Sequence, residues 1–457
     1  MRKSKLVSLL SLAAVFLAGA GVARADLVIK ITKGVNQPTP IAVVPFAWKG
    51  TGAAPVNVAK VVSDDLARSG LFAPLPSSQM LARPTASADV HFANWKAVNV
   101  NYLVIGSITS SGNDVNVRFR LFNVYTGRQL LGYELPGTKD HLRFTAHLVS
   151  DMIYQKLTGK RGAFATRIAY VQELGRNGPW QLVVADADGA NPHVVVHSSG
   201  LLMSPDWSPD GKKIAYVEYE HNRSHIYVQN VATGQRKRVI SHPGIKSAPV
   251  FSPQGNKLAV VIAGSDGNSD IYIYDFASGN LHRFTHSPAI DTEPAWMPDG
   301  QSLVFTSDRG GSPQIYEKRL GGERVQRLTW NGTYNTRATV APDGKSIALV
   351  HRQHGRLEIG LLDLATGNLK ILTKGPLDRS PTFAPNGALI LYDSLEQDKH
   401  VLATVSVDNR VRTEISGNSG GLSQPAWGPF PPRPAARPAA AAPQGADAAA
   451  GVDNRPK

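Results

Sequence analysis

The 457-residue chain contains no cysteine, so it forms no disulfide and has no thiol to which a lipid anchor could be attached. Exported proteins are free to use disulfides, and this chain must instead be stabilised by the burial of apolar side chains, for which it is long enough. The sequence also lacks a Walker phosphate loop and a glycine-rich dinucleotide fingerprint. It therefore indicates no nucleotide or other cofactor.

Long apolar runs are missing after the first 25 residues. Residues 1–25 combine a basic start, an apolar run over residues 6–20 and a small-x-small site, ARA, at residues 23–25. This pattern predicts a secretory signal peptide that is cleaved between Ala25 and Asp26. The apolar run is shorter than the roughly 20 residues that span a bilayer. We therefore expect a soluble exported protein that is peripheral to membranes and does not span them.

Acidic residues are fewer than basic ones, with 35 Asp and Glu against 49 Lys and Arg, and the formal net charge is +14. A nucleic-acid-binding protein concentrates its cations in a patch or stripe. Here Lys and Arg are spread through the whole chain, without a basic stripe interleaved with aromatic residues. We therefore expect the positive charge to steer the protein weakly toward acidic partners or surfaces. We do not expect nucleic-acid binding.

One motif recurs six times, and its clearest copy is WSPDG at residues 207–211, followed by a short apolar strand. A fixed period in the forties with several short strands per repeat is typical of a β-propeller, in which each repeat forms one blade. The pattern predicts an all-β six-bladed β-propeller over residues 164–427. The copies begin 43 to 45 residues apart, at Trp207, Phe251, Trp296, Val340, Phe383 and Trp427.

The residue types of this motif are explained by structure alone. Proline fixes φ, and glycine with Asn or Asp supplies the positive φ that tight turns need. The aromatic residue is expected to fill the wedge between neighbouring blades. In each repeat, the inner strand ends at the aromatic residue and the second strand follows the turn. The array begins with a second strand at residues 167–171 and ends with an inner strand at residues 423–427. The first blade should therefore take its inner strand from the C-terminal end. This closure removes the open sheet edges.

Residues 26–160 have no such repeat and mix the periodicities of helices and strands. Asn57 is placed to cap the first helix, and Gly159 to end the last one. The mixture predicts an N-terminal α/β domain with a small mixed sheet. Helices are predicted over residues 58–69, 92–97 and 142–157, and strands over residues 27–32, 41–46, 102–109, 114–124 and 129–134.

The two ends of the propeller connect to very different segments. Residues 160–162 leave no room for a long linker, so the two domains are predicted to pack against each other. Residues 428–457 are rich in proline and alanine and have no apolar periodicity. Because such a segment buries no core, it is predicted to be a disordered tail.

Three motifs could indicate catalysis or metal binding, and each has a simpler explanation. GNSGG at residues 417–421 matches G-x-S-x-G, but no helix and no histidine follow it, as a nucleophile elbow would require. DGNSD at residues 266–270 resembles a calcium loop, but isoleucine stands at its sixth position and no glutamate at its twelfth. His221 and His225 lack the further ligands of a metal site. We predict no enzyme, no catalytic residue and no metal site.

A propeller gathers segments of every blade around its central channel, and in these segments the six copies differ most. They should form a ring with separated charges, Glu293 against Arg337 and Arg379, which is suited to gripping a loop or helix of another protein. The ring residues three positions before each aromatic position are Ser204, Ala248, Glu293, Arg337, Ser380 and Gln424. The residues one position further back are Met203, Ser247, Thr292, Thr336, Arg379 and Ser423.

The chain resembles the TolB family, the periplasmic propellers of the Tol-Pal system. The similarity covers about residues 26–430, whereas propellers of the prolyl oligopeptidase type share only the SPDG motif. Matching stretches are PIAVVPFAW (40–48), DLARSGLFAPL (65–75), KLTGKRGAFATRIAYV (156–171), LMSPDWSPDGKKIAYV (202–217), DTEPAWMPDG (291–300) and AWGP (426–429).

This resemblance implies a non-catalytic adaptor in the periplasm, which we expect to be a monomer. In the family, the propeller mouth binds the peptidoglycan-associated lipoprotein Pal, and colicin-like bacteriocins exploit the same surface. The mature N-terminal segment engages the inner-membrane protein TolA. The assembly supports outer-membrane integrity and constriction at cell division. The alternatives are a propeller-type peptidase or esterase, and a propeller that binds a small ligand or a glycan.

The resemblance also implies positions for both partner sites. Carried over by position, the Pal site includes Lys246, Ala248, Thr292 and Glu293. Two features depart from the family pattern, namely the charge pattern of the N-terminal segment and the Pro/Ala-rich tail. With the ring, the predicted Pal-binding residues are Ser204, Lys246, Ala248, Thr292, Glu293, Arg337, Arg379 and Gln424. The predicted TolA-binding residues are Asp26, Leu27, Val28, Ile29, Lys30, Ile31, Thr32 and Lys33.

Overall fold

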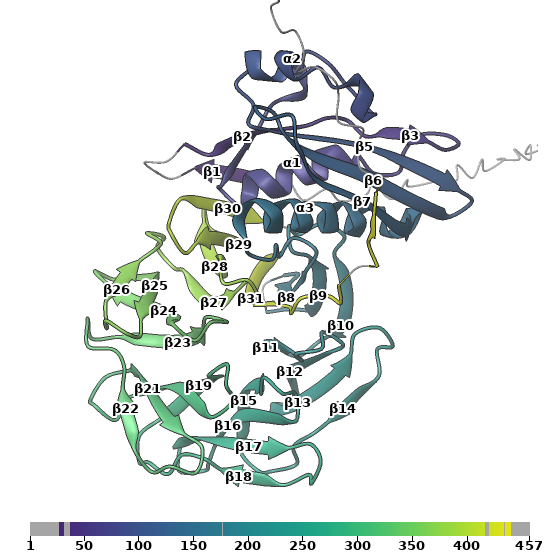
Figure 1. The fold of residues 1–457 in the computed structure, drawn as a ribbon. Coiled ribbons are helices and arrows are strands. Elements are labelled where there is room, and N and C mark those ends of the chain that lie inside the picture. The colour runs from purple at the N-terminus through teal and green to yellow at the C-terminus, as the bar shows by residue number, and fades with distance from the viewer. Residues whose placement is uncertain (1–26, 32–36, 176, 416–419, 434, 440–457) are drawn as a thin grey trace, which may run out of the picture.

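The computed structural model describes residues 27–31, 37–175, 177–415, 420–433 and 435–439. They form an N-terminal α/β domain that sits against a six-bladed β-propeller (Figure 1). The predicted fold class is therefore confirmed. The predicted signal peptide and its cleavage site between Ala25 and Asp26 lie outside the described residues.

The N-terminal domain is built on one mixed sheet with the strand order β32-β7-β6-β5-β2-β4, and β3 pairs with β5 beside this path. Pairing is parallel from β4 through β2 to β5, and antiparallel from β5 through β6 and β7 to β32. The strands are β2 (Thr39–Val43), β3 (Ala47–Lys49), β4 (Phe72–Pro74), β5 (Tyr102–Ser111), β6 (Asp114–Asn123), β7 (Gln129–Thr138) and β32 (Arg437–Pro438).

Two helices cover the face of this sheet that looks toward the propeller (Figure 1). They are α1 (Val58–Arg68) and α3 (Leu142–Thr158). Asn57 caps α1 by accepting a hydrogen bond from Lys60 N at 3.1 Å, and Gly159 ends α3 with a φ of 78°. Short helices accompany them: α2 (Phe92–Ala97), η1 (Ser77–Gln79), η2 (Ser87–Asp89) and η3 (Lys139–His141).

Each propeller blade is an antiparallel meander of four strands that runs from the channel outward. Blade 1 consists of β31 (Gly421–Trp427), β8 (Arg167–Glu173), β9 (Trp180–Asp186) and β10 (His193–Ser198). Blade 2 consists of β11 (Leu202–Trp207), β12 (Lys213–Glu220), β13 (Arg223–Asn230) and β14 (Arg236–Arg238). Blade 3 consists of β15 (Ile245–Phe251), β16 (Lys257–Ala263), β17 (Ser269–Asp275) and β18 (Leu281–Arg283). Blade 4 consists of β19 (Asp291–Trp296), β20 (Ser302–Ser307), β21 (Gln314–Arg319) and β22 (Val325–Arg327). Blade 5 consists of β23 (Asn335–Val340), β24 (Ser346–Gln353), β25 (Arg356–Asp363) and β26 (Leu369–Ile371). Blade 6 consists of β27 (Arg379–Phe383), β28 (Leu389–Glu396), β29 (Lys399–Ser406) and β30 (Val411–Ile415).

The ring closes as the sequence predicts. The C-terminal strand β31 pairs with β8, so that Trp427 lies opposite Ile168. The indole Nε1 of Trp427 also donates a hydrogen bond to Thr166 Oγ1 at 2.8 Å. The first blade is therefore completed by non-covalent contacts between the two ends of the array, and its sheet has no open inner edge.

The repeated motif performs the two structural roles expected of it. Trp207 is buried among side chains of blades 1 and 2, and its Nε1 donates to Ala426 O of blade 1 at 3.2 Å. Gly211 has a φ of 68°, and its N–H donates to Ser208 O at 2.8 Å, which closes the turn into β12. The aromatic residue thus joins neighbouring blades, and the Pro-Asp-Gly turn joins neighbouring strands.

The N-terminal strand β1 (Leu27–Ile31) belongs to the propeller sheet, although it precedes the N-terminal domain in the chain. It pairs antiparallel with the outer edge of blade 6, with Leu27 opposite Ile415 and Ile31 opposite Val411. The predicted TolA-binding residues Asp26, Thr32 and Lys33 lie outside the described residues. The other five form this added strand.

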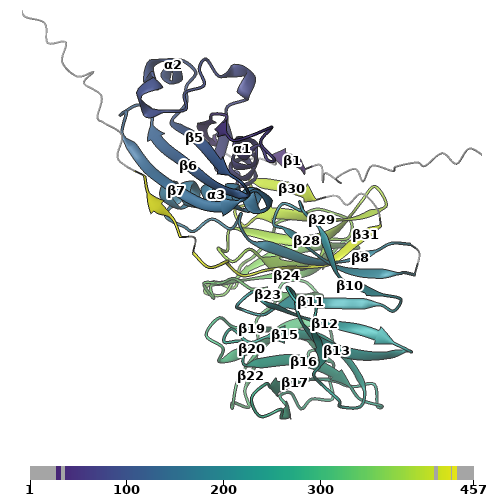
Figure 2. The same ribbon diagram turned by 90° about the vertical axis from the view of Figure 1, so that its right-hand side faces the viewer.

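Residues 428–439, apart from 434, differ from the predicted disordered tail. After β31 the chain extends to the N-terminal sheet (Figure 2). On the way, the Phe430 ring packs against Arg161, whose guanidinium lies 4.2 Å from the ring centroid. There β32 pairs with β7, and Ala439 N donates to Gly132 O at 2.9 Å. An extended segment needs no apolar periodicity to pair with an open sheet edge, which is why the composition of this segment did not predict it. Residues 440–457 lie outside the described residues.

Candidate functional site

Every inner strand of the propeller is interrupted at the same position. The register of the strand pairing shifts there in all six blades, as in a β-bulge. A positive φ is uncommon for residues other than glycine, and a bulge re-aims a side chain. The ring residues therefore lie within the inner strands and not in loops before them. They are Ser204, Ala248, Glu293, Arg337, Ser380 and Gln424, each with a φ between 46° and 52°.

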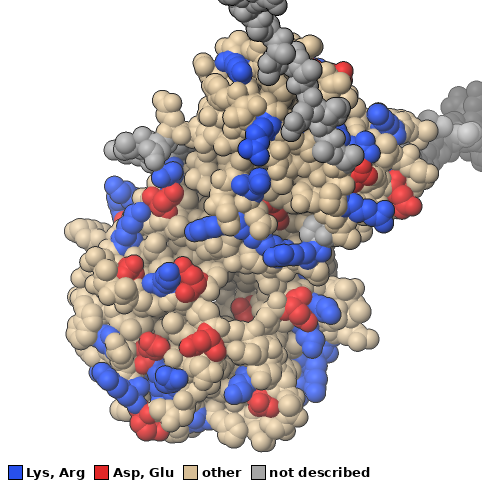
Figure 3. Space-filling view, in the orientation of Figure 1, with Lys and Arg blue, Asp and Glu red and all other residues tan. Residues whose placement is uncertain are grey.

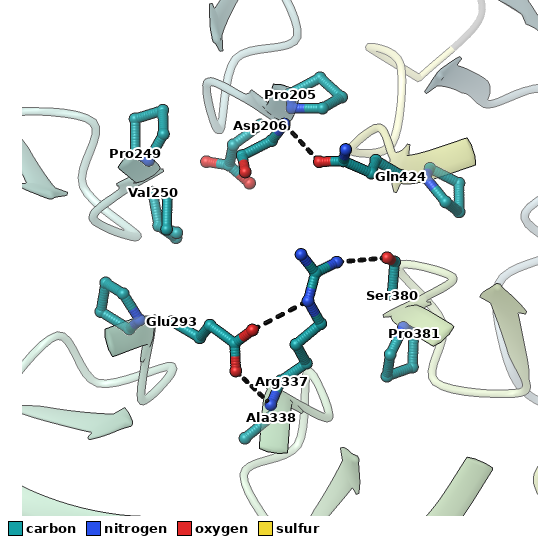
Figure 4. A pocket seen from close by; sticks show the side chains of 14 residues that line it. Pro205, Asp206, Pro249, Val250, Glu293, Arg337, Ala338, Ser380, Pro381 and Gln424 are labelled. Carbon is teal, nitrogen blue, oxygen red and sulfur yellow. Dashed lines mark hydrogen bonds and ion pairs between the residues drawn. The ribbon is translucent and has the colours of Figure 1, made fainter. Parts of the chain in front are cut away.

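These bulged residues come together around the central channel (Figure 4). They line a cavity of about 150 Å³, and the space-filling view shows the hollow at the centre of the propeller (Figure 3). A proline follows the bulged residue in five blades, and Ala338 follows it in the other. The lining residues are Ser204, Pro205, Asp206, Ala248, Pro249, Val250, Glu293, Pro294, Arg337, Ala338, Ser380, Pro381, Gln424 and Pro425.

Glu293 and Arg337 form the charged centre of this ring. Arg337 Nε donates to Glu293 Oε1 at 2.9 Å, and Glu293 Oε2 accepts from Arg337 N at 2.8 Å and from Thr306 Oγ1 at 2.9 Å. The guanidinium also donates to the hydroxyl of Ser380 (Figure 4). Hydrogen bonds to ionised groups are stronger than neutral ones, so this network ties blades 4, 5 and 6 together and presents both charges to the channel.

The remaining predicted Pal-binding residues occupy different places. Gln424 Oε1 accepts a hydrogen bond from Ser204 N at 2.8 Å, which links blades 1 and 2 across the channel wall. Thr292 lies next to Glu293 in β19. Arg379 Nε lies 3.2 Å from Asp393 Oδ2 instead of near Glu293. Lys246 does not line the channel but a separate cavity between blades 2 and 3.

Asp206 is a channel residue that we did not select from the sequence. Its Oδ2 accepts a hydrogen bond from Phe251 N of the next blade at 2.8 Å. Burial raises the pKa of Asp206 to about 7, although the N–H groups of Phe251 and Trp207 act in the opposite direction. An aspartate stands directly before the motif's aromatic residue, where the other five copies have Val, Ala or Thr, and this difference was the available signal.

Three exposed apolar residues, which we call the apolar rim, lie at or shortly before the starts of the inner strands of blades 3, 4 and 5. Ile245 is the first residue of β15, Ile290 directly precedes β19, and Trp330 lies in the loop before β23. All three are exposed, Trp330 by 73%, and the Arg327 guanidinium lies 4.6 Å from its ring centroid. Large exposed apolar side chains around a cavity are typical of binding surfaces. The N-terminal domain contacts the opposite ends of the inner strands, near Trp427.

The motifs considered for catalysis and metal binding do not assemble into a site among the described residues. Asp270 pairs with Arg283, and His225 Nε2 lies 3.9 Å from Glu220 Oε2 in the β12–β13 hairpin. His221 has a φ of 48° in the turn of that hairpin. Ser419 lies outside the described residues. These positions agree with the structural explanations given for the motifs.

Among the described residues, a cluster of side chains that could serve as metal ligands lies at the interface between the two domains. It consists of Asp65 in α1, His147 in α3 and Asp188 in the β9–β10 turn. His147 is 1% exposed, and its Nδ1 lies 2.7 Å from Asp65 Oδ2. Its Nε2 lies 3.9 Å from Asp188 Oδ2 and 4.0 Å from Asp186 Oδ2, and has no hydrogen-bond partner among the described residues.

Two guanidinium groups share this space, so the cluster is an ion-pair network. Arg68 Nη2 lies 3.1 Å from Asp65 Oδ1, and its Nη1 donates to Ala187 O of the propeller at 2.7 Å. Arg143 contacts Asp188, and its Nε lies 3.4 Å from Asp186 Oδ2. Three carboxylates therefore meet two guanidinium groups, and a protonated His147 makes the interface neutral.

The protonation of these groups follows from that balance. Burial lowers the pKa of His147, but Asp65, Asp188 and Asp186 outweigh it, so its pKa is raised. Burial raises the pKa of Asp188, yet His147, Arg68 and Arg143 bring it down to about 2. His147 is thus held charged between carboxylates of both domains.

Comparison with known proteins agrees with this architecture. The TolB amino-terminal domain family matches residues 27–130, and the TolB beta propeller domain family matches residues 154–431. The chain belongs to the TolB family. A Tol-Pal system protein TolB of Xanthomonas oryzae pv. oryzae (strain MAFF 311018) is 43% identical over 410 residues, which cover 88% of this chain and 93% of the relative.

Further relatives support the same assignment over the whole architecture. The Tol-Pal system protein TolB of Xanthomonas campestris pv. campestris (strain B100) is 43% identical over the same shares of both chains. The crystal structure of TolB from Acinetobacter baumannii superposes with a TM-score of 0.81 at 38% identity, covering 89% of this chain and 100% of that one. This TolB-family chain is therefore a component of the Tol-Pal system. Among the residues described, no helix has the length and apolarity needed to cross a bilayer.

Proposed function

We propose that this chain is a non-catalytic adaptor of the periplasm that binds Pal through the propeller mouth and TolA through its N-terminal segment. In this role it supports outer-membrane integrity and constriction at cell division, and the mouth also serves colicin-like bacteriocins. The observation that carries the proposal is the ring of six bulged residues. It converges six side chains on one channel and leaves them open to a partner.

The chemistry of the mouth favours a protein partner over a small substrate. The ring offers one ion pair, three hydroxyl or amide side chains and several prolines, but no nucleophile with an adjacent base. The exposed residues Ile245, Ile290 and Trp330 of the apolar rim lie at or shortly before the starts of three of the inner strands that carry the ring. Exposed apolar anchors around a polar cavity match the composition of protein interfaces, in which Trp and Arg are enriched.

The position of β1 supports the second half of the proposal. The segment adds a strand to blade 6 by antiparallel backbone pairing with β30. A strand at a sheet edge is able to exchange one pairing partner for another, because backbone hydrogen bonds are independent of side-chain identity. We infer that TolA competes with blade 6 for this segment.

The mouth is tested by removing exposed rim contacts that the fold does not need. Trp330→Ala combined with Ile290→Ser should weaken binding of the purified periplasmic domain of Pal by about 2 kcal/mol or more, because buried interface Trp residues are frequent hot spots. The measurement is isothermal titration calorimetry.

Leu81→Ala is the matched control, since Leu81 is an exposed apolar residue of the N-terminal domain, away from the mouth. It should bind Pal as the wild type does, and all variants should unfold at the same temperature. Wild-type affinity of the double variant would exclude the rim, and absence of Pal binding by the wild type would overturn the proposed function.

A further inference from the structure

A second cavity opens between blades 2 and 3, at the start of the inner strand β15. The β12–β13 turn, the end of β14 and the β14–β15 loop enclose about 460 Å³. Five basic side chains line it, namely Arg223, His225, Arg238, His242 and Lys246, and we call this cavity the basic pocket. None of the residues that line it, all of which the structure describes, is acidic.

The cations of the basic pocket are poorly compensated. His225 has one carboxylate neighbour, Glu220 at 3.9 Å, and that side chain also accepts a hydrogen bond from Tyr227 Oη at 2.7 Å. Within the described part of the chain, Arg223 and Arg238 make no ion pair. Elsewhere in blade 2, by contrast, Arg236 pairs with Glu218.

Lys246 is the most enclosed of these groups, with 7% of its surface exposed. Its Nζ donates to Gly244 O at 2.8 Å, and an ammonium group has three N–H donors, so donors remain for a ligand. A charged side chain that is this buried is usually paired. The pocket therefore has the donor composition of an anion-binding site.

The electrostatics of the pocket point in the same direction. Burial lowers the pKa of Lys246, and the charge of Arg238 lowers it further. Burial also lowers the pKa of His225, with Arg238, Lys246 and Arg223 adding to the effect against the opposing charge of Glu220. Each cation thus makes the charge of its neighbours more costly, and a bound anion would relieve this repulsion.

The position of the pocket indicates the source of that anion. Lys246 and Ala248 belong to the same strand, β15, and Ala248 lines the channel. Ile245, the neighbour of Lys246, belongs to the apolar rim. A protein seated on the mouth therefore lies directly beside the basic pocket.

We propose that the basic pocket receives a carboxylate side chain of the protein that occupies the propeller mouth, so that recognition is divided between an apolar rim and a charged pocket. This inference rests on the proposed function, since it concerns the same partner. Arg223 and Arg238 at the pocket's edge steer the acidic segment, and Lys246 receives the carboxylate inside. The site thereby selects for a partner that carries an Asp or Glu at a position from which its side chain reaches the basic pocket while another part of the partner occupies the propeller mouth.

Charge reversal at the pocket edge tests this proposal. Arg223→Glu and Arg238→Glu should each weaken binding of the purified Pal domain about tenfold, with a slower association rate and a flatter salt dependence. Lys246→Met, which keeps the length of the side chain, should raise the dissociation rate. Binding is measured by surface plasmon resonance at low and high salt.

Lys237→Glu is the matched control, because Lys237 is an exposed residue of β14 between two arginines but does not line the pocket. It should bind as the wild type does, and unfolding temperatures should agree among all the variants. If the pocket variants keep the affinity and salt dependence of Lys237→Glu while the rim variants lose binding, the pocket proposal is overturned and the proposed function stands. If inorganic phosphate binds the pocket without competing with the Pal domain, the pocket is an anion site unrelated to the partner, which also overturns the proposal.

Discussion

At the scale of single residues, the same backbone geometry at six positions of the channel carries five kinds of side chain. Each bulged residue has nearly the same positive φ, yet the side chains are Ser, Ala, Glu, Arg, Ser and Gln. A positive φ costs a non-glycine residue conformational energy, and such strain persists where the surrounding structure over-determines it. Here the following proline, the bulged register and contacts to the next blade supply that restraint, while the side chains remain free to define a binding surface.

Asp206 provides a prediction at this scale. Because burial raises its pKa to about 7, the folded state binds a proton more tightly than the unfolded state. The stabilisation is present at low pH and is lost as pH rises from the ordinary value near 4 toward about 7. Asp206→Asn should remove this pH dependence and make the propeller more stable than the wild type above pH 7, by about 1–3 kcal/mol.

The measurement is the free energy of unfolding by urea between about pH 5 and pH 8. Asp343→Asn is the control, since Asp343 occupies an exposed turn of blade 5 and lacks contacts with the channel. A wild-type pH profile for Asp206→Asn would show that this carboxyl is ionised throughout and that its burial carries no energetic cost.

At the scale of elements, the two domains are joined by contacts that come from distant parts of the chain. The linker is held at Asp151, whose Oδ1 accepts from Phe164 N at 2.7 Å. The C-terminal segment adds β32 to the N-terminal sheet, and the ion-pair cluster around His147 joins α1 and α3 to the β9–β10 turn. Together these contacts explain why a connection of a few residues still gives two packed domains.

The cluster predicts that domain docking depends on pH. A histidine whose pKa is raised in the folded state contributes stability that is present below its ordinary pKa and is lost as pH rises through the raised one. The groups that face His147 are Asp65 and Arg68 from α1, Arg143 and Asp151 from α3, and Asp186 and Asp188 from blade 1. Loss of its proton leaves the buried cluster with an excess negative charge, so we expect the interface to loosen at alkaline pH.

Because the chain contains no cysteine, spin labels can be placed at Ser77→Cys on the N-terminal domain and Lys237→Cys on the propeller. Pulsed electron paramagnetic resonance should show a narrow distance distribution at about pH 6 that broadens toward pH 9. His147→Gln should give the broad distribution at both values, at a cost of about 3 kcal/mol in docking. His351→Gln, which changes a buried histidine inside blade 5, should behave as the wild type does. A distribution that does not change with pH in the wild type contradicts the prediction.

At the scale of the whole molecule, the N-terminal segment and the mouth occupy separate regions of the propeller. β1 lies on the outer edge of blade 6, whereas the rim residues belong to blades 3, 4 and the loop before blade 5. Since β1 is an added fifth strand, blade 6 keeps its four-stranded meander without it. The two proposed partners can therefore be separated by mutation.

Deletion of residues 26–33 should abolish association with TolA while binding of the Pal domain is preserved or increased, as measured by pull-down with both purified partners. A variant in which the same residues are shuffled serves as the control for chain length, and circular dichroism checks the fold. Loss of both interactions to the same extent would indicate misfolding, and unchanged TolA binding would place the TolA site elsewhere.

The sequence by itself determined the features that depend on neighbouring residues. The aromatic and the Pro-Asp-Gly turn, repeated with one period, define the blades, and the strand types at the two ends define how the ring closes. Local turn chemistry and strand order act over a few residues and need no knowledge of distant contacts. For the same reason Asn57 and Gly159 predicted the ends of α1 and α3 correctly.

Only the tertiary structure decided which side chains meet across long separations. Glu293 and Arg337 form an ion pair instead of separated charges, Arg379 turns to Asp393 and Lys246 enters a separate pocket, because the twist of each blade sets the direction of its side chains. The cluster of Asp65, His147 and Asp188 combines three segments that carry no shared motif. Likewise, the segment after β31 is ordered because the open edge of β7 lies within its reach, which its composition does not reveal.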